Sequence, residues 1–227
     1  MPTLKIYDQL LQFPLFQGMS HDDLEIVAGH IRFGFMKVSA GKRIITAGDP
    51  CTQLYFVISG TVKVEHFSDD GRFSVLEHMS APYVIQQEAI FGYYQRYTRS
   101  VSAQSDVSLL TIDKEEVLRL LEDFLVFRLN LVNHFATQTQ KLSQQLWRKP
   151  PQSLREKVIR FLVAHCSYPA GSKTFLILME RLALELNDSR LNVSRVLNQL
   201  QYEGLVELHR GRLVIPQLER LLSSRLP

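Results

Sequence analysis

Apolar residues in the first half of the chain come in short runs, some strictly alternating with polar residues. Gly, Asp or Pro residues separate these runs between Ile31 and Ile112, and Asp70-Gly71 is a typical hairpin turn between two of them. Many short runs with regular turn signals are typical of an antiparallel barrel or roll. The predicted strands are 33–38, 43–46, 54–58, 61–66, 73–79 and 107–112.

Apolar residues take a helical spacing after Ile112. Asp113 and Glu116 have the spacing of a capping box, and a longer helix is predicted from about residue 124 to Trp147. Pro150-Pro151 disfavours helix immediately before it and marks a domain boundary. The pattern therefore predicts an α+β chain with a β-roll domain over residues 1–112, connecting helices over 113–149 and a C-terminal domain over 150–227.

The C-terminal domain contains two short amphipathic helices, between residues 179 and 200, joined by a tight turn. Ala183 is small enough to let the helices cross closely, and Asn187 tolerates the positive φ that the turn needs. Val193 then fills the angle between the helices, since it lies on the apolar face of the second one. These three residues at this spacing predict a helix-turn-helix.

The other face of the second helix is polar. Its side chains can donate hydrogen bonds to phosphates and to base edges, with Ser189 at the helix start assigned to a phosphate. Two short apolar runs follow around a basic turn with Gly211, which predicts a β-hairpin wing that touches the DNA backbone. An ordinary helical hairpin with a solvated polar face is the alternative. The candidate DNA contacts are Ser189, Arg190, Asn192, Arg195, Gln199, Arg210 and Arg212.

Charge is divided unevenly and favours the DNA-binding interpretation. Residues 1–140 hold 12 Lys and Arg against 16 Asp and Glu, whereas residues 141–227 hold 14 against 7. A basic C-terminal part beside an acidic N-terminal part predicts a polyanionic partner for the former. Two distant cysteines, no signal-peptide pattern and no apolar run long enough for a bilayer predict a cytoplasmic protein without a membrane span or metal cluster.

The ordered pattern of a Gly-punctuated roll, a long helix and a winged helix resembles the cyclic AMP receptor protein (Crp/Fnr) family of bacterial transcription regulators over nearly the whole chain. Residues 54–64, LYFVISGTVKV, look like that family's strand-Gly-strand signature, and Gly41 and Gly48-Asp49 precede it at the usual distance. Arg99-Ser100 resembles the end of its phosphate-binding cassette, and Ser189-Arg190 with Arg195 matches its DNA-reading helix. The resemblance implies a homodimeric, sequence-specific regulator that binds a two-fold site on double-stranded DNA, senses an effector in the roll and works with RNA polymerase.

The positions that would hold the effector depart from the family pattern. Gln86-Gln87 stands where cyclic-nucleotide binders have Gly-Glu, and Gln140-Lys141 replaces the Thr-Ser pair that touches adenine. The resemblance implies that cyclic AMP binds weakly or not at all, and that the effector is a small anionic or nucleotide-like molecule or has been lost. Arg99 fits either an anion or an ordinary ion pair. The implied effector-binding positions are Gln86, Gln87, Arg99, Ser100 and Gln140.

The long helix carries apolar residues at a spacing near 3.5, which is typical of a helix that pairs with its own copy. Together with the resemblance, this predicts a dimer seam through Leu131, Phe135, Leu142 and Leu146. The alternative is that the helix packs on its own domain.

Two further interpretations use histidines. An enzyme in the roll would need several inward His residues with a carboxylate, and a haem sensor would need one axial ligand. His66 and His78 lie in the roll but in no ligand pattern. We therefore expect no enzyme, no catalytic residue and no metal ligand. Leu191 stands where the family often has Glu, so a cytosine amino group would lose its acceptor and the target sequence should differ.

Overall fold

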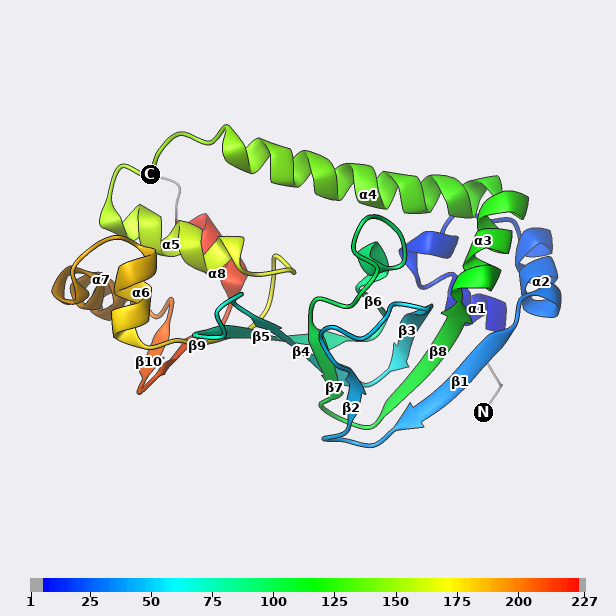
Figure 1. The fold of residues 1–227 in the computed structure, drawn as a ribbon, viewed down its shortest axis with the longest axis horizontal. Coiled ribbons are helices and arrows are strands. Elements are labelled where there is room, and N and C mark those ends of the chain that lie inside the picture. The colour runs from blue at the N-terminus through cyan, green and yellow to red at the C-terminus, as the bar shows by residue number, and fades with distance from the viewer. Residues whose placement is uncertain (1–5, 225–227) are drawn as a thin grey trace. The chain divides into compact units, whose positions relative to one another are not determined.

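The computed structural model describes residues 6–224 (Figure 1). Within this range, packing divides the chain into two units. The first contains the residues up to Val62 together with Met79–Arg148, and the second contains Lys63–His78 together with the residues from Lys149 onward. The sequence also predicts a short helix over residues 4–15, and the first two of these residues lie outside the described range.

The first unit begins with short helices, α1 (Ile6–Leu10), the 3-10 turn η1 (Pro14–Phe16) and α2 (His21–His30). Ser20 caps α2, because its hydroxyl accepts from the Asp23 backbone N–H at 3.1 Å while the Asp23 carboxylate accepts from the Ser20 N–H at 3.4 Å. Such reciprocal bonds satisfy two backbone donors that the first helical turn leaves open.

The antiparallel roll is confirmed. One sheet has the order β1-β8-β3-β6, with Phe33 opposite Ile112 in β1 and β8, and Phe56 opposite Leu110 in β3 and β8. The strands β6 and β7 were missed because they have only three and four residues and no clear alternation. The strands are β1 (Phe33–Val38), β2 (Arg43–Ile45), β3 (Gln53–Ser59), β4 (Thr61–Phe67), β5 (Ser74–Ser80), β6 (Tyr83–Ile85), β7 (Ser100–Ala103) and β8 (Val107–Asp113), with a 3-10 turn η2 (Gln87–Ala89) after β6.

Helices α3 (Lys114–Asp123) and α4 (Leu125–Leu146) follow the roll, close to their predicted bounds. The capping box predicted at the start of α3 does not form, because Asp113 makes no side-chain cap bond. The Glu116 side chain is buried and instead accepts a 3.1 Å hydrogen bond from Arg119 Nη1, one turn further along. The first part of α4 packs on η1, where the Phe127 ring lies 5.1 Å from that of Phe16.

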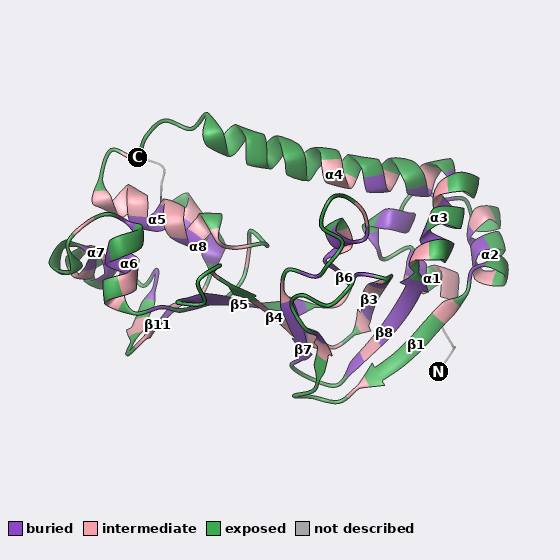
Figure 2. Cartoon of the chain, in the orientation of Figure 1, coloured by how far each residue is buried: buried purple, intermediate pink, exposed green. Residues whose placement is uncertain are grey.

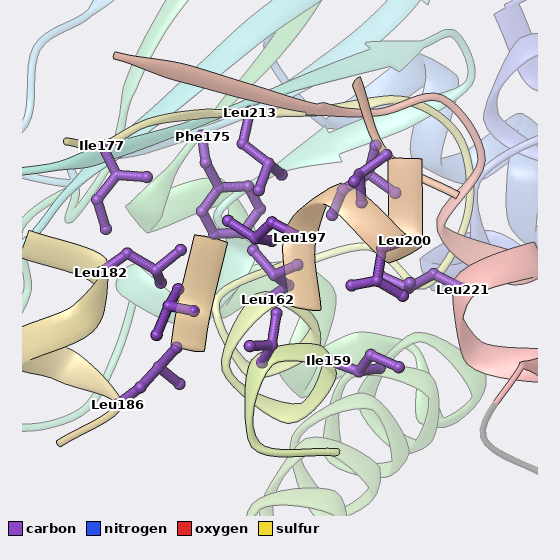
Figure 3. Close-up of a cluster of buried hydrophobic side chains, with 14 of the residues drawn as sticks. Ile159, Leu162, Phe175, Ile177, Leu182, Leu186, Leu197, Leu200, Leu213 and Leu221 are labelled. Carbon is purple, nitrogen blue, oxygen red and sulfur yellow. The ribbon is translucent and has the colours of Figure 1, made fainter. Parts of the chain in front are cut away.

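The second unit contains the predicted helical hairpin and the wing. Its elements are α5 (Leu154–Ala164), β9 (Lys173–Leu176), α6 (Met179–Glu185), α7 (Arg190–Tyr202), β10 (Glu207–His209), β11 (Arg212–Ile215) and α8 (Leu218–Ser223). Ser153 caps α5, since its hydroxyl accepts from the Glu156 N–H at 3.1 Å. Figure 3 shows the apolar core, in which Phe175, Leu197 and Leu162 are completely or almost completely buried.

The hairpin of β4 and β5 packs with this second unit. Residues Ser74–Glu77 of β5 pair antiparallel with Lys173–Leu176 of β9, so the sheet runs β10-β11-β9-β5-β4. Phe73 and Val75 join the core of the winged helix. The boundaries 1–112, 113–149 and 150–227 remain a prediction; by packing, residues 63–78 group with the C-terminal part although they precede it by far in the sequence.

A buried ion pair joins the hairpin to β9. Lys173 Nζ donates to Glu77 Oε1 at 2.8 Å, and the two side chains are 1% and 3% exposed. The Glu77 carboxylate also accepts from the backbone N–H groups of Ser167, at 2.9 Å, and Tyr168, at 3.1 Å. Burying a carboxylate is costly unless it is paired and hydrogen-bonded, and Glu77 is both.

Candidate nucleic-acid interface and effector site

The turn between α6 and α7 has the predicted geometry. Asn187 has φ 46°, and the next N–H, that of Asp188, donates to the Ala183 carbonyl at 3.1 Å. Ser189 caps α7 by accepting from the Asn192 N–H at 3.2 Å. Val193 and Ala183 are both buried, so the helices meet where small and apolar residues were predicted.

The polar face of α7 is centred on one straight stripe. Residues 191, 195, 198 and 202 recur at helical spacing, which places them on the side opposite the buried residues Val193, Leu197 and Leu200. All four stripe residues are exposed, and Figure 2 colours α7 by the burial of its residues. The stripe consists of Leu191, Arg195, Asn198 and Tyr202.

Of the predicted DNA contacts on α7, Arg195 alone lies on this stripe. Arg190 lies to one side, where its Nη1 is 3.4 Å from Glu180 Oε1, and Asn192 donates to Asp188 Oδ1 at 2.9 Å. Among the described residues, no hydrogen bond or ion pair involves the Arg195 guanidinium, which leaves it available for an external partner.

Gln199 flanks the stripe on the other side. Its amide donates to Glu203 Oε1 at 3.2 Å, and Glu203 also accepts from Arg155 at 2.9 and 2.6 Å, which lowers the pKa of that carboxyl. Asn198 and Tyr202 were missed, although helical counting from Val193 and Leu197 could have found them.

The wing turn consists of Arg210 and Gly211, with His209 opposite Arg212 in the β10–β11 ladder. Gly211 has φ 71°, a left-handed conformation that glycine adopts without strain. Both arginines are exposed. The turn therefore presents two guanidinium groups to solvent at the end of a short hairpin.

The cassette of the roll is held together by Gln86. This residue is buried, has φ 42°, and accepts through Oε1 from the backbone N–H groups of Thr98 and Arg99, both at 2.9 Å. Its Nε2 donates to the Arg99 carbonyl at 2.8 Å. One side chain thus occupies two backbone donors that could otherwise bind an anion.

The Arg99 guanidinium is also occupied, because it forms an ion pair with Glu88. Beside it, Gln87 Nε2 lies 2.9 Å from Nε2 of His134 on α4. Burial lowers the pKa of His134, and the Glu88 carboxylate partly offsets this effect. Glu88 follows the Gln pair directly in the sequence, whereas no sequence pattern relates His134 to the cassette.

The structure brings four of the five predicted effector positions together. Gln86, Gln87 and Arg99 form the network above, and the buried Ser100 hydroxyl accepts from the Ala47 N–H at 3.0 Å. Gln140, in contrast, is exposed on α4, and within residues 6–224 its side chain makes no hydrogen bond.

The predicted seam on α4 needs one correction. Leu131 is 3% exposed because it packs inside its own unit, and Phe135 is half-buried. Leu142 and Leu146 are exposed as a seam requires. The sequence period is compatible with both faces, and only packing distinguishes them.

In the part of the chain that the structure describes, no helix is both long and apolar enough to span a bilayer. No group of three or more His, Cys, Asp or Glu side chains is placed to hold a metal ion among those same residues. Burial and the nearby Lys63 and Lys173 lower the pKa of His78, and His66 lies in the β4–β5 hairpin.

Comparison with known proteins identifies both parts. Residues 35–124 match the cyclic nucleotide-binding domain, and residues 156–224 match the Crp-like helix-turn-helix domain. The "Cyclic AMP receptor protein" of Thermus thermophilus is 26% identical over 198 residues, 87% of this chain and 90% of that protein. The "cAMP-activated global transcriptional regulator Vfr" of Pseudomonas aeruginosa is 23% identical over 187 residues, 79% of this chain and 87% of that protein.

Solved structures show the same fold. The Catabolite Activator Protein of Thermus thermophilus superimposes with a TM-score of 0.52 at 24% identity, covering 93% of this chain and 97% of the other. The sensor domain of the transcriptional regulator DNR from Pseudomonas aeruginosa gives 0.52 at 21% identity, covering 65% of this chain and 95% of the domain. By name, Vfr and DNR are transcriptional regulators. The chain, with a cyclic nucleotide-binding domain followed by a Crp-like helix-turn-helix, belongs to the Crp/Fnr family of transcription regulators.

Proposed function

We propose that this regulator is a homodimer that binds a two-fold operator through α7 of each protomer, and that cyclic AMP is not its effector. The observation that carries the DNA-binding part is the exposed stripe on α7 with the available Arg195 at its centre. In a helix-turn-helix the second helix lies in the major groove and its N-terminal residues reach the base edges. RNA polymerase is the further partner that a regulator of this kind requires.

The candidate contacts divide into two classes. Arg195 and Arg190 are the proposed base readers, because an Arg can bind guanine O6 and N7 together. Arg210 and Arg212 at the wing are proposed phosphate contacts, and Ser189 and its neighbouring N–H groups at the start of α7 suit a phosphate as well. Asn192 and Gln199 must exchange their bonds to Asp188 and Glu203 before they can reach a base.

Dimerisation is proposed through a face of α4 that differs in part from the predicted seam. Exposed apolar side chains occur at Leu125 (57%), Leu129 (49%), Val132 (54%) and Leu146 (84%). With the small residues at 136, 139 and 143, they follow a heptad spacing along one side of the helix. A dimer through this face can present two α7 helices about 34 Å apart, the spacing of successive major grooves.

Light scattering tests this face. Glu at both Leu129 and Val132 should give a monomer, because two buried unpaired charges cost several kcal/mol each. The matched control is Arg128→Glu, at an exposed position on α4 that does not belong to the proposed dimer face. A double variant that remains a full-sized dimer would exclude this face as the main contact.

The proposal that cyclic AMP is not the effector rests on the side chains that already occupy the anion-binding groups of the cassette. Gln86 takes the two backbone donors and Glu88 takes the guanidinium, so an incoming phosphate would have to displace both. Each displaced group costs binding energy, because a neutral hydrogen bond such as those of Gln86 contributes about 0.5–1.5 kcal/mol and one between charged groups more. The same arrangement favours the second candidate, a regulator of this fold that needs no ligand, since the cassette's own side chains satisfy its anion-binding groups.

Calorimetry with cyclic AMP tests whether the occupied cassette excludes this nucleotide. The natural chain should show no micromolar affinity for cyclic AMP. A variant with Gln86→Gly and Glu88→Ala should bind it more tightly, because the backbone N–H donors and the Arg99 guanidinium are then free to meet the phosphate. Micromolar affinity in the natural chain, lost in Arg99→Ala, would overturn the effector part of the proposal.

DNA binding is tested by titrations over a salt series on a selected operator and on a scrambled duplex. Arg195→Ala should cost about 1–3 kcal/mol on the operator and weaken preference at one base pair per half-site. Arg212→Ala should weaken both duplexes equally and lower the salt slope by about one unit per lost contact. Arg128→Ala, in the first unit, is the control. Unchanged preference in Arg195→Ala would show that the reading helix is placed wrongly.

A further inference from the structure

We infer that Leu191 reads the 5-methyl group of a thymine in each operator half-site. This inference rests on the proposed DNA binding through α7 and deepens it, because it assigns a base to a position that carries no polar group. Leu191 is therefore a specificity-determining residue in addition to the arginines.

Its place on the helix supports this role. Leu191 lies in the first turn of α7, one turn before Arg195 on the stripe opposite the core, and it is 60% exposed. A reading helix inserts its N-terminal turn most deeply into the groove. At 60% exposure much of its side chain meets solvent in the described chain, whereas in the groove it would meet base edges.

The neighbours of Leu191 are polar, so the contribution of Leu191 itself to DNA binding is an apolar contact. On one side Arg190 is directed to Glu180 at 3.4 Å, and on the other Asn192 is tied to Asp188 at 2.9 Å. Hydrogen bonds from Asn192 and from the Ser189 N–H lower the pKa of Asp188, so its charge holds this arrangement at neutral pH. The first turn thus offers the hydrocarbon surface of Leu191 between the polar side chains of Arg190 and Asn192.

The major groove presents one apolar group, the thymine methyl, and a leucine can accept no hydrogen bond from cytosine N4. Removal of the methyl from water against Leu191 favours T·A at this position, and the loss of solvation at an unpaired cytosine amino group disfavours C·G. The chemistry therefore assigns a T·A base pair to the position that Leu191 meets. Since Leu191 lies one turn before Arg195 on α7, this position is at or next to the base pair that Arg195 contacts.

The test uses deoxyuridine, which differs from thymine only by the methyl. On an operator selected with the full-length protein, each thymine of one half-site is replaced in turn. The natural chain should lose roughly fourfold in affinity at one position, the value for one buried methyl. Leu191→Ala should bind the thymine operator more weakly and show no loss with deoxyuridine there. Leu191→Met should retain most of the loss, because its side chain still reaches the methyl.

Leu184→Ala is the matched control, since Leu184 is 65% exposed on α6 and outside the stripe. It should keep the deoxyuridine effect unchanged. A natural chain that prefers its operator but tolerates deoxyuridine at every position would overturn the inference while the proposed function stands. A chain that shows no preference for any duplex would overturn the proposed function itself. Persistence of the deoxyuridine effect in Leu191→Ala would assign the methyl contact to another residue.

Discussion

Replacement of Lys173 by Met should destabilise the second unit strongly. The substitution keeps the length and much of the volume of the side chain but removes the ammonium that pairs with Glu77 at 2.8 Å. The Glu77 carboxylate then stays 3% exposed, with the N–H groups of Ser167 and Tyr168 as its remaining partners.

The magnitude follows from this geometry. Removing one partner of a buried ion pair costs about 3–5 kcal/mol, because the other charge stays desolvated. Two backbone donors still reach Glu77, so we expect the lower end, about 3 kcal/mol. Glu77→Gln in the Lys173→Met background removes the buried charge and keeps one acceptor oxygen, which serves one of the two N–H donors, so the double variant should recover part of the loss.

Urea denaturation followed by circular dichroism measures the free energies, and hydrogen exchange over residues 63–78 and 149–224 assigns the loss to the second unit. Lys149→Met, at an exposed lysine, is the control and should stay within about 0.5 kcal/mol of the natural chain. If Lys173→Met unfolded at the same urea concentration as the natural chain, the buried pair would not stabilise the hairpin on β9. A double variant less stable than the single one would contradict the charge argument.

Three other outcomes are expected. Gly60→Ala should cost more than about 1 kcal/mol in urea, because Gly60 has φ +88° and an added Cβ would lie 2.3 Å from a backbone oxygen, whereas Gly71→Ala, at φ +66° with nothing within 4 Å, should cost less. The pKa of His134, measured by NMR, should lie below 6.5 and fall further in Glu88→Gln. The unfolded chain binds this proton more tightly than the folded one. The contribution of neutral His134 to the free energy of unfolding is therefore complete above pH 6.5 and is lost as pH falls through the folded pKa. Burial raises the pKa of Cys166 to about 12, so iodoacetamide should modify it at pH 7 roughly a thousandfold more slowly than a free thiol until the protein is denatured.

The local elements and the turn of the helix-turn-helix followed from the sequence. Strand bounds such as 33–38, the long helix and the positive φ of Asn187 depend on side chains a few residues apart, and their spacing is written in the chain. The capping box at Asp113 did not form even at this short range: the Asp113 side chain makes no cap bond, and the Glu116 carboxylate pairs with Arg119.

Only the tertiary structure decided which partner each side chain meets. Leu131 and Leu129 fit one apolar period equally well, yet the first is buried and the second exposed. Arg99 and Glu88 were both visible in the sequence, but their pairing, and the occupation of the cassette donors by Gln86, depend on backbone conformation.

Glu77 and Lys173 illustrate the general reason, since they lie 96 residues apart and form one buried pair. Periodicity reports which residues share a face of a helix or strand. It carries no information on what covers that face, because burial and desolvation arise only when distant segments come together.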